Sequence, residues 1–408
     1  MIPRCGFAGY ADAVCAEISV RADEIRRSLG SVPGCPDTLY IGGGTPSVLP
    51  AEIIARIASV CRQVTEGARA SGHAGSFDEF TVEVNPDDIV RKGTRYAEDL
   101  LRAGVTRVSM GVQSMDDRVL EWMNRRHDAT TARKAYRILM EAGIDNVSVD
   151  LIFGYDPGNI SPSLTDSEGY WTEMLDRILD IGGNGRPPRH ISAYQLSLEE
   201  GSVLEEMVSD GKYTEASGES CVGQYALVCR ILAAAGYRHY EISNFALPGS
   251  EAIHNSAYWR HVPYTGIGPA AHSLCCSSGD VRTQVTASGK RAEVAGKGVW
   301  TRRWNLPDTD AYLAAASSGR FGDIAGSEVL TPLLYREEEI MLGLRTDTGV
   351  PFSLLAADRE TAANMEKLLR AGALVPVGTA IRDIHSGSRL RIPEDHFFVS
   401  DDIISELI

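Results

Sequence analysis

The sequence predicts an α/β protein whose larger part is a parallel sheet flanked by helices, followed by a small and mostly helical C-terminal domain. Strand-like and helix-like segments alternate regularly between residues 38 and 243, which is the pattern of repeated strand, helix and strand units. Crossovers in such units are right-handed, so we expect one parallel sheet. An open doubly wound sheet and a curved barrel of the (β/α)6 type both fit this alternation.

The individual elements follow from the spacing of apolar residues and from the glycines that end helices. Val14, Ile18 and Ile25 recur at helical spacing and predict an amphipathic helix over residues 10–29. The strands are expected at residues 38–42, 79–85, 106–112, 146–153, 190–196 and 238–243. The helices between them are expected at residues 50–66, 95–103, 129–142, 163–181 and 218–235.

Composition and charge exclude several classes of function. The net charge of −15 over 408 residues opposes non-specific binding to nucleic acid or anionic lipid, because both need a positive surface. The sequence contains no run of 18 apolar residues, so no membrane-spanning segment is predicted. The first residues lack a charged leader before an apolar core. We therefore expect a cytoplasmic protein with small-molecule or protein partners and no nucleic-acid partner.

The eight cysteines are irregularly spread, and no Cys-x-x-Cys occurs. In a large chain of this kind a disulfide framework is not expected. The spacing of the cysteines also predicts no metal motif.

A glycine-rich turn ends the first expected strand. Residues 38–49 read TLYIGGGTPSVL, and three consecutive glycines, Gly42 to Gly44, permit positive φ and a close approach of the backbone to a ligand. Pro46 fixes φ, and Ser47 is expected to cap the following helix. A tight turn without any ligand accounts for these residues equally well, because the pattern is neither the Walker loop nor the dinucleotide fingerprint.

Polar residues also stand at the ends of the other expected strands. They are Glu83 and Asn85, Gly111 and Gln113, Asp150 and Gly154, and Tyr194 and Gln195. Because the carboxyl ends of parallel strands meet at one rim, we expect these residues to converge. Glu83 taken alone is also explained as a hydrogen-bonded structural carboxylate. With the glycine turn of the first strand, polar or glycine residues stand at the ends of five strands, and this coincidence favours a cofactor site.

The remaining stretches complete a three-part division of the chain. Residues 1–245 are predicted to form the core, and residues 246–307 an aromatic loop with a mobile surface insertion at 275–299. The aromatic loop is read as a lid or pocket wall, with a packed Ω-type loop as the alternative. Residues 308–408 combine helices with two short β-like stretches, which is typical of a winged-helix module.

Ten motifs are similar to those of a known family. They are IGGGTPS, EVNPDD, RVSMGVQSM, NRRH, DNVSVDLIFG, HISAYQLSLEEG, GYRHYEISNFALPG, HNSAYW, GIGPAAHS and EEEIMLGLRTDTG. They span nearly the whole chain. The chain resembles the radical S-adenosylmethionine (SAM) proteins of the oxygen-independent coproporphyrinogen III oxidase family, and within it the haem-chaperone branch, HemW. The resemblance implies a partial parallel (β/α)6 radical SAM barrel that lacks its first strand, followed by the C-terminal domain of that family.

The resemblance also implies which residues bind SAM. Those that match the family's SAM pocket are Gly43, Gly44, Thr45, Glu83, Gln113, Arg125 and Asp150. The turn residues match the backbone that binds the amino and carboxylate groups of SAM, for which backbone donors and acceptors are suited. Glu83 matches the carboxylate that reaches the ribose. The last three match side chains that line this pocket or the second SAM pocket of the oxidase members.

His254 in the HNSAYW segment matches the motif implicated in haem handling in the chaperone branch. An imidazole is a natural axial ligand of haem iron, and the neighbouring aromatic residues suit a porphyrin face. The alternative is a loop histidine that hydrogen-bonds only its neighbours.

The sequence departs from the family at its cluster motif. The family opens with a Cys-x3-Cys-x2-Cys loop that holds a [4Fe-4S] cluster, whereas Cys5 and Cys15 do not have that spacing. Without three thiolates the cluster does not form, and SAM is not reductively cleaved. We therefore expect an N-terminally truncated chain that does not cleave SAM, rather than a natural cluster-free variant.

Three functions follow from the resemblance. The leading hypothesis is a haem chaperone that binds haem as cargo and delivers it to haem-accepting proteins. The alternative is an oxygen-independent coproporphyrinogen III oxidase, which decarboxylates its substrate with SAM. A third is a cluster-free SAM or nucleotide-binding module. The YEISNFALPG and HNSAYW segments favour the chaperone.

Overall fold

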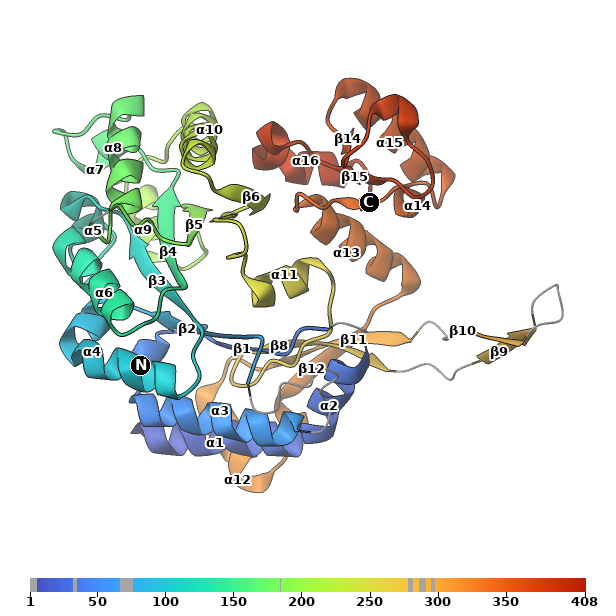
Figure 1. Cartoon of the computed structure of the whole chain (residues 1–408), viewed down its shortest axis with the longest axis horizontal. Coiled ribbons are helices and arrows are strands. Elements are labelled where there is room, and N and C mark those ends of the chain that lie inside the picture. Colours follow the sequence, from blue (N-terminus) through green and yellow to red (C-terminus); the bar gives the residue numbers. More distant parts are fainter. Residues whose placement is uncertain are drawn as a thin grey trace. The chain divides into compact units, whose positions relative to one another are not determined.

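The computed structural model describes residues 6–31, 35–66, 76–183, 185–277, 282–285, 291–294 and 298–408 (Figure 1). The chain forms two compact units, each assembled from three separate segments. The first unit consists of Met1–Leu39, Leu49–Glu79 and Ile253–Leu342, and the second of Tyr40–Val48, Phe80–Ala252 and Gly343–Ile408. The bounds of these units differ from the boundaries expected after residues 245 and 307. The three-part division of the chain stays a prediction.

The first unit contains most of the N-terminal helices and a small antiparallel sheet. Its elements are α1 (Gly6–Val20), α2 (Ala22–Ser31), α3 (Ala51–Thr65), α11 (Ile253–Trp259), β8 (His272–Ser277), β9 (Arg282–Val285), β10 (Arg291–Val294), β11 (Val299–Asn305), α12 (Thr309–Ser318), η2 (Phe321–Ile324) and β12 (Ala325–Val329). The expected single helix over residues 10–29 is divided between α1 and α2. β8, β11 and β12 form one sheet, and β9 and β10 form a hairpin. The hairpin lies in the expected insertion, whose other residues fall partly outside the described ranges.

The second unit holds the main sheet and the helices that cover it. β1 (Thr38–Ile41), β2 (Glu79–Val84) and α13 (Pro332–Leu344) cross from one unit into the other. The elements that follow along the second unit up to its third segment are η1 (Pro46–Val48), α4 (Pro86–Arg102), β3 (Arg107–Gln113), α5 (Asp117–Trp122), α6 (Ala129–Glu141), β4 (Val147–Phe153), α7 (Pro157–Ile160), α8 (Glu168–Leu179), β5 (His190–Gln195), α9 (Val203–Ser209), α10 (Gly218–Ala234), β6 (Arg238–Glu241) and β7 (Asn244–Ala246).

The main sheet has the strand order β1-β2-β3-β4-β5-β7-β6 and is parallel from β2 to β5. It curves into a partial barrel, which confirms the expected fold class. The expectation that all strands of this sheet are parallel is wrong at its end, because β7 lies between β5 and β6 and is antiparallel to both. A three-residue strand is too short for its hydrophobic pattern to reveal it.

Side chains of the parallel strands alternate between an apolar and a polar face. The apolar set is buried and consists of Val82, Val84, Val108, Met110, Val147, Val149, Leu151, Ile191 and Ala193. The opposite face carries Glu83, Arg107, Ser109, Ser148, Asp150, His190 and Ser192, and the strand register aligns these positions. The helices cover the apolar face, where α4 packs against α6 and α8 against α10. The polar face is therefore the inner surface of the curved sheet.

The C-terminal segment of the second unit is built on a three-stranded sheet of order β13-β15-β14. Its elements are β13 (Val350–Pro351), α14 (Phe352–Leu355), α15 (Arg359–Ala371), β14 (Val375–Pro376), η3 (Ile381–Asp383), β15 (Arg389–Arg391), η4 (Glu394–Val399) and α16 (Ser400–Ser405). Helices with a small sheet agree with the winged-helix-like expectation. Among the described residues, no helix has the length and apolar character needed to cross a membrane.

Candidate functional site

The glycine turn after β1 is fixed by a carboxylate from β2. Gly43 has a φ of 79°, and its N–H donates to Glu83 Oε2 at 3.2 Å. Tyr40 donates its hydroxyl to Glu83 Oε1 at 2.7 Å. A Cβ at Gly42 would lie 2.5 Å from that same oxygen, whereas the space around Gly44 is open. The turn and the carboxylate therefore form one fixed arrangement that requires glycine at residue 42.

Ser47 does not cap the next helix, contrary to expectation. Residues Pro46–Val48 form η1, and α3 begins without a side-chain cap. The buried Ser47 hydroxyl donates to Asp88 Oδ2 at 2.8 Å and accepts from the Asn85 N–H at 3.0 Å. The carbonyl of Thr45 accepts from the backbone N–H of Val48 at 3.0 Å, which closes the turn. Ser47 thus ties the turn to the start of α4.

Asp150 lies on the polar face of the sheet. Ser109 Oγ is 3.2 and 3.3 Å from its two carboxylate oxygens. Burial raises the pKa of Asp150 to about 6, although the positive charge of Arg107 and the bond from Ser109 act in the opposite direction. Burial lowers the pKa of Arg125, and the negative charge of Asp150 raises it. The charge of Asp150 therefore acts on Arg125, while their assignment to one SAM pocket stays a prediction.

Gln113 ends β3 in the left-handed region, with a φ of 69°. Its side chain folds back along the strand, so that Nε2 would lie 2.9 Å from a Cβ at Gly111. Oδ1 of Asn85, at the end of β2, would lie 3.7 Å from the same point. The polar ends of β2 and β3 therefore share the space above Gly111.

His254 lies in the first unit, on α11. The HNSAYW segment, expected in an aperiodic loop, forms this short helix, and none of its residues is buried. His254 Nδ1 is 2.7 Å from Thr38 Oγ1, and Nε2 is 2.8 Å from Tyr258 Oη. The first N–H groups of the helix, those of Ile253 and His254, donate to the two oxygens of Glu79 at 2.8 and 3.1 Å. Both nitrogens of the imidazole therefore have protein partners.

Comparisons with known proteins agree with these motifs. The model of the radical SAM superfamily matches residues 5–162. The "Heme chaperone HemW" of Mycobacterium tuberculosis is 31% identical over 372 residues, which cover 91% of this chain and 80% of the relative. The protein of the same name from Lactococcus lactis is 31% identical over 313 residues, which cover 77% and 70%.

This chain belongs to the HemW family of radical SAM proteins. Among solved structures, the coproporphyrinogen III oxidase HemN from Escherichia coli, described as a radical SAM enzyme, matches 98% of this chain and 83% of its own. The TM-score is 0.67 and the sequence identity 16%, so this match shows a shared fold.

Membership of the radical SAM superfamily implies SAM as a cofactor, and the polar face of the second unit fits it. SAM carries an ammonium, a carboxylate and two ribose hydroxyls. The glycine turn offers backbone groups, Glu83 and Asp150 offer acceptors, and Arg125 offers a cation.

The superfamily also implies a [4Fe-4S] cluster. Cys5 lies outside the described residues. Within the described part of the chain, the only His, Cys and carboxylate group close enough to hold a metal contains a single cysteine. A set of three thiolates is therefore not found among these residues.

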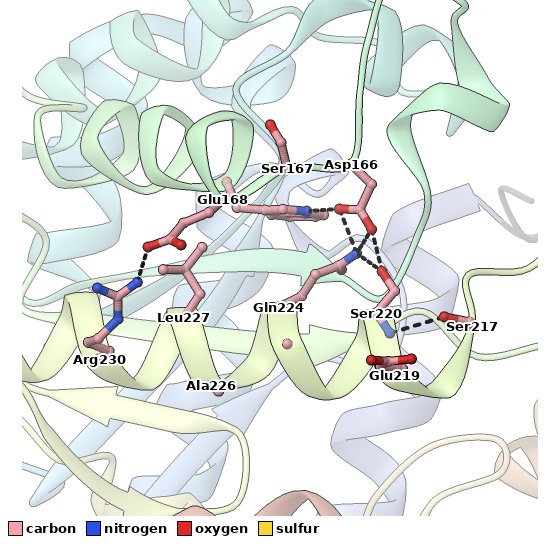
Figure 2. Close-up of a pocket in the computed structure, with 12 residues that line it drawn as sticks. Asp166, Ser167, Glu168, Ser217, Glu219, Ser220, Gln224, Ala226, Leu227 and Arg230 are labelled. Atoms are coloured by element: carbon pink, nitrogen blue, oxygen red, sulfur yellow. Dashed lines mark hydrogen bonds and ion pairs between the residues drawn. The ribbon is translucent and has the colours of Figure 1, made fainter.

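A cavity of about 600 Å³ lies between α8 and α10 of the HemW-family barrel (Figure 2). Asp166, which lines this cavity, accepts hydrogen bonds from Trp171 Nε1 at 2.7 Å, from the Ser220 hydroxyl and from Gln224 Nε2 at 3.2 Å. Gln224 Oε1 in turn accepts from the N–H of Gly154 at 2.7 Å. The polar groups of the cavity satisfy one another, so they brace α8, α10 and the end of β4.

Sequence reasoning missed most residues of the polar face, which are Tyr40, Arg107, Ser109, Ser148, His190 and Ser192. Tyr40 was read as one of the apolar residues of its strand. It precedes Gly42 by two positions, so it lies on the same face of the sheet as Gly42. Ser109 and Arg107 precede Gly111 by two and four positions, so counting back by twos from the strand end would have found both.

Proposed function

We propose that this protein is a haem chaperone, which binds haem on α11 and delivers it to haem-accepting proteins. The observation that carries the proposal is the 31% identity to HemW proteins over most of the chain, with His254 placed on an accessible helix. Those relatives are named haem chaperones, and the residues of α11 are suited to a haem ligand.

The surface of α11 supports a flat apolar ligand. Ile253 and Tyr258 are exposed by 38% and 37% although both are large and apolar. The ring of Tyr264 contacts that of Tyr258 at 4.6 Å in an edge-on arrangement. Aromatic and aliphatic groups that remain uncovered on one short helix are typical of a ligand or partner surface.

The hydrogen bonds of His254 define how it would ligate iron. When the N–H group at Nδ1 donates a hydrogen bond to Thr38 Oγ1, Nε2 carries the lone pair, which accepts a hydrogen bond from the Tyr258 hydroxyl. Metal-binding histidines usually have their second nitrogen oriented in this way. Tyr258 must turn away before Nε2 reaches iron, so Tyr258 competes with haem.

We therefore expect opposite effects from two variants of α11. His254→Ala should weaken haem binding at least about tenfold, because it removes the axial ligand. Tyr258→Phe should keep or strengthen binding, because it removes the competing hydroxyl and retains the ring. Haem titration followed through the Soret band measures both.

His272→Ala is the matched control, because His272 is an exposed histidine of the same unit. Its haem binding should equal that of the unchanged protein. The absence of a Soret shift, or equal binding by His254→Ala, would contradict the proposal.

We also propose that SAM binds at the glycine turn of the second unit. Backbone groups of Gly43, Gly44 and Thr45 would hold its amino acid end, and Glu83 its ribose. Gln113, Arg125 and Asp150 would line the remainder. When bound and reduced by a cluster, SAM supplies radical chemistry, whereas these residues only bind and orient it.

The coproporphyrinogen III oxidase activity is the alternative. The HemN structure supports the fold alone at 16% identity. Anaerobic conversion of coproporphyrinogen III with SAM by this protein would overturn the choice of a chaperone.

A further inference from the structure

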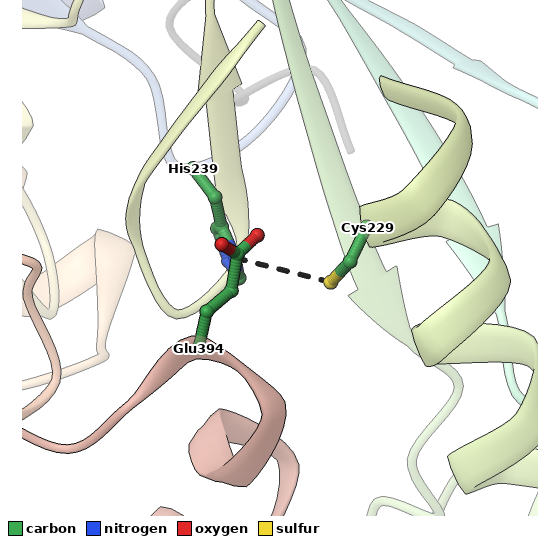
Figure 3. Close-up of side chains that lie close together, drawn as sticks. All are labelled: Cys229, His239 and Glu394. Atoms are coloured by element: carbon green, nitrogen blue, oxygen red, sulfur yellow. Dashed lines mark hydrogen bonds and ion pairs between the residues drawn. The ribbon is translucent and has the colours of Figure 1, made fainter. Parts of the chain in front are cut away.

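Three metal-ligand side chains meet in the second unit, away from the glycine turn (Figure 3). Cys229 comes from α10, His239 from β6 and Glu394 from the start of η4. Their ligand atoms all lie within 4.8 Å of one another. His239 Nδ1 is 3.1 Å from Glu394 Oε1 and 3.8 Å from Cys229 Sγ.

The other nitrogen of His239 fixes the tautomer of the ring. Nε2 lies 3.3 Å from Tyr225 Oη and 3.4 Å from the carbonyl oxygen of Ile242. Tyr225 donates its own proton to that carbonyl at 2.7 Å, so both neighbours of Nε2 are acceptors. Nε2 therefore carries a hydrogen, and Nδ1 of the neutral ring turns its lone pair toward Cys229 and Glu394.

A lone pair that faces a carboxylate at 3.1 Å is unfavourable unless a positive charge lies between them. A proton on Nδ1 would form an ion pair between His239 and Glu394 and would not involve the Cys229 thiol. A divalent cation would engage all three groups. The imidazole ring of His239 is held in place by two aromatic rings. Phe245 stacks on it with 4.1 Å between ring centroids, and Phe397 meets it edge-on at 5.0 Å.

Two of the three spacings are close to those around a tetrahedral ion, whereas Cys229 Sγ and Glu394 lie up to 4.8 Å apart and would have to approach each other. Bonds of about 2.3 Å to sulfur and about 2.0 to 2.2 Å to nitrogen and oxygen place tetrahedral ligands roughly 3.3 to 3.6 Å apart. The two distances from Nδ1 differ from these values by a few tenths of an ångström. The Glu394 side chain is 46% exposed, so it has room to adjust, whereas the His239 side chain is only 2% exposed.

We propose that Cys229, His239 and Glu394 bind one Zn²⁺ ion, with the fourth position open to solvent beside Glu394. A thiolate and an imidazole favour zinc over magnesium or calcium. Three protein ligands with one open position are the arrangement found at reactive zinc sites. The ion would join η4 of the C-terminal segment to α10 and β6.

A cysteine thiol must lose its proton to ligate a metal ion. The proposed binding therefore has a second signature, the release of a proton from Cys229 for each ion bound.

The test is a titration of the reduced, metal-free protein with Co²⁺, which reports thiolate ligation through a charge-transfer band, followed by displacement with Zn²⁺. The unchanged protein should bind one ion per chain. Cys229→Ser should lose the band, and Glu394→Gln should weaken binding at least about tenfold. Zn²⁺ should raise the melting temperature of the unchanged protein and not that of Cys229→Ser.

Cys221→Ser is the matched control, because Cys221 is a free cysteine on the same helix, α10. This variant should retain the band. Glu394→Gln keeps the test valid if Cys229→Ser does not fold, because Glu394 lies at the surface. A band that persists in Cys229→Ser, unchanged affinity in Glu394→Gln, or no band in the unchanged protein would overturn the proposal.

Discussion

Asp150 lies in the middle of β4, on the polar face of the sheet, and its surroundings oppose its charge. Its ordinary pKa of 3.8 rises to about 6 because the surrounding protein removes water from the carboxylate. The folded protein therefore holds the proton of Asp150 more tightly than the unfolded chain does. Between these two pKa values stability falls as pH rises, and above about pH 6 the full cost of the charge is present. A group that destabilises its own fold is common at binding sites.

Asp150→Asn should therefore stabilise the protein at neutral pH. We expect a gain of about 1 to 3 kcal/mol in the free energy of unfolding near pH 7.5, and a much smaller gain near pH 4, where Asp150 is protonated in the fold. SAM binding should weaken in the same variant. Urea denaturation at the two pH values measures the first effect, and isothermal titration measures the second.

Asp23→Asn is the control for this change, because the Asp23 side chain is 88% exposed. It should alter stability by less than about 0.5 kcal/mol at either pH. Equal stability of Asp150→Asn and the unchanged protein at neutral pH would contradict the cost assigned to this charge.

Asp150, which was expected at a strand end, lies in the middle of β4. The sequence predicted Glu83 correctly at the end of β2, because position along a parallel strand determines the rim on which a residue lies. It did not predict the bonds that Tyr40 and Gly43 make to Glu83. Those bonds depend on how β1 and β2 are placed against each other, which one strand alone does not reveal. It likewise missed Cys229, His239 and Glu394, which come from segments far apart in the chain.

At the scale of elements, α11 depends on a residue far from it in sequence. Glu79 is only 3% exposed, and its carboxylate accepts from the first N–H groups of the helix. A helix of seven residues is marginal by itself, so its ends must be satisfied by other parts of the chain. This explains why HNSAYW lacked a visible helical signal although it is helical in the folded protein.

Glu79→Ala should destabilise the protein by about 1 to 3 kcal/mol, because it removes the acceptor of the first two N–H groups of α11. It should also weaken haem binding, because α11 carries His254. Glu79→Gln should have a smaller effect, since its amide oxygen still accepts. Thermal denaturation and Soret titration together measure the two consequences.

Asp308→Ala is the matched control at another helix of the same unit. Asp308 caps α12 by accepting from the N–H of Ala311 at 2.9 Å. Its loss should cost about 1 kcal/mol of stability and leave haem binding unchanged. Equal loss of haem binding in Asp308→Ala and Glu79→Ala would show that α11 has no special dependence on Glu79.

At the scale of the whole molecule, the chain passes repeatedly between its two units. The core of the first unit shows the consequence, because the fully buried Glu17 of α1 is bonded by groups that lie more than two hundred residues later. Gly268 N–H, Asn305 Nδ2 and Tyr312 Oη each donate to its carboxylate at 2.9 Å. The alternation of strands and helices predicted the second unit well. It gave no sign that the N-terminal helices pack with residues 253–342, since helical periodicity does not identify the partner of a helix.

The division at residue 245, which the sequence favoured, can be tested against this arrangement. Residues 1–245 produced alone would keep Glu17 but lose all three of these partners. Arg21 would remain 3.0 Å from the Glu17 carboxylate. Each hydrogen bond to a charged group contributes about 1.5 to 3 kcal/mol, so the loss of three is a large share of the roughly 5 to 15 kcal/mol that stabilises a folded protein. We therefore expect residues 1–245 to show no cooperative unfolding transition by circular dichroism, whereas the full chain shows one.

Glu17→Gln in the full chain, which removes the charge but keeps the donors in place, should be destabilised and still unfold cooperatively. A sharp transition for residues 1–245 would establish them as an independent domain and contradict the dependence of α1 on the later segment.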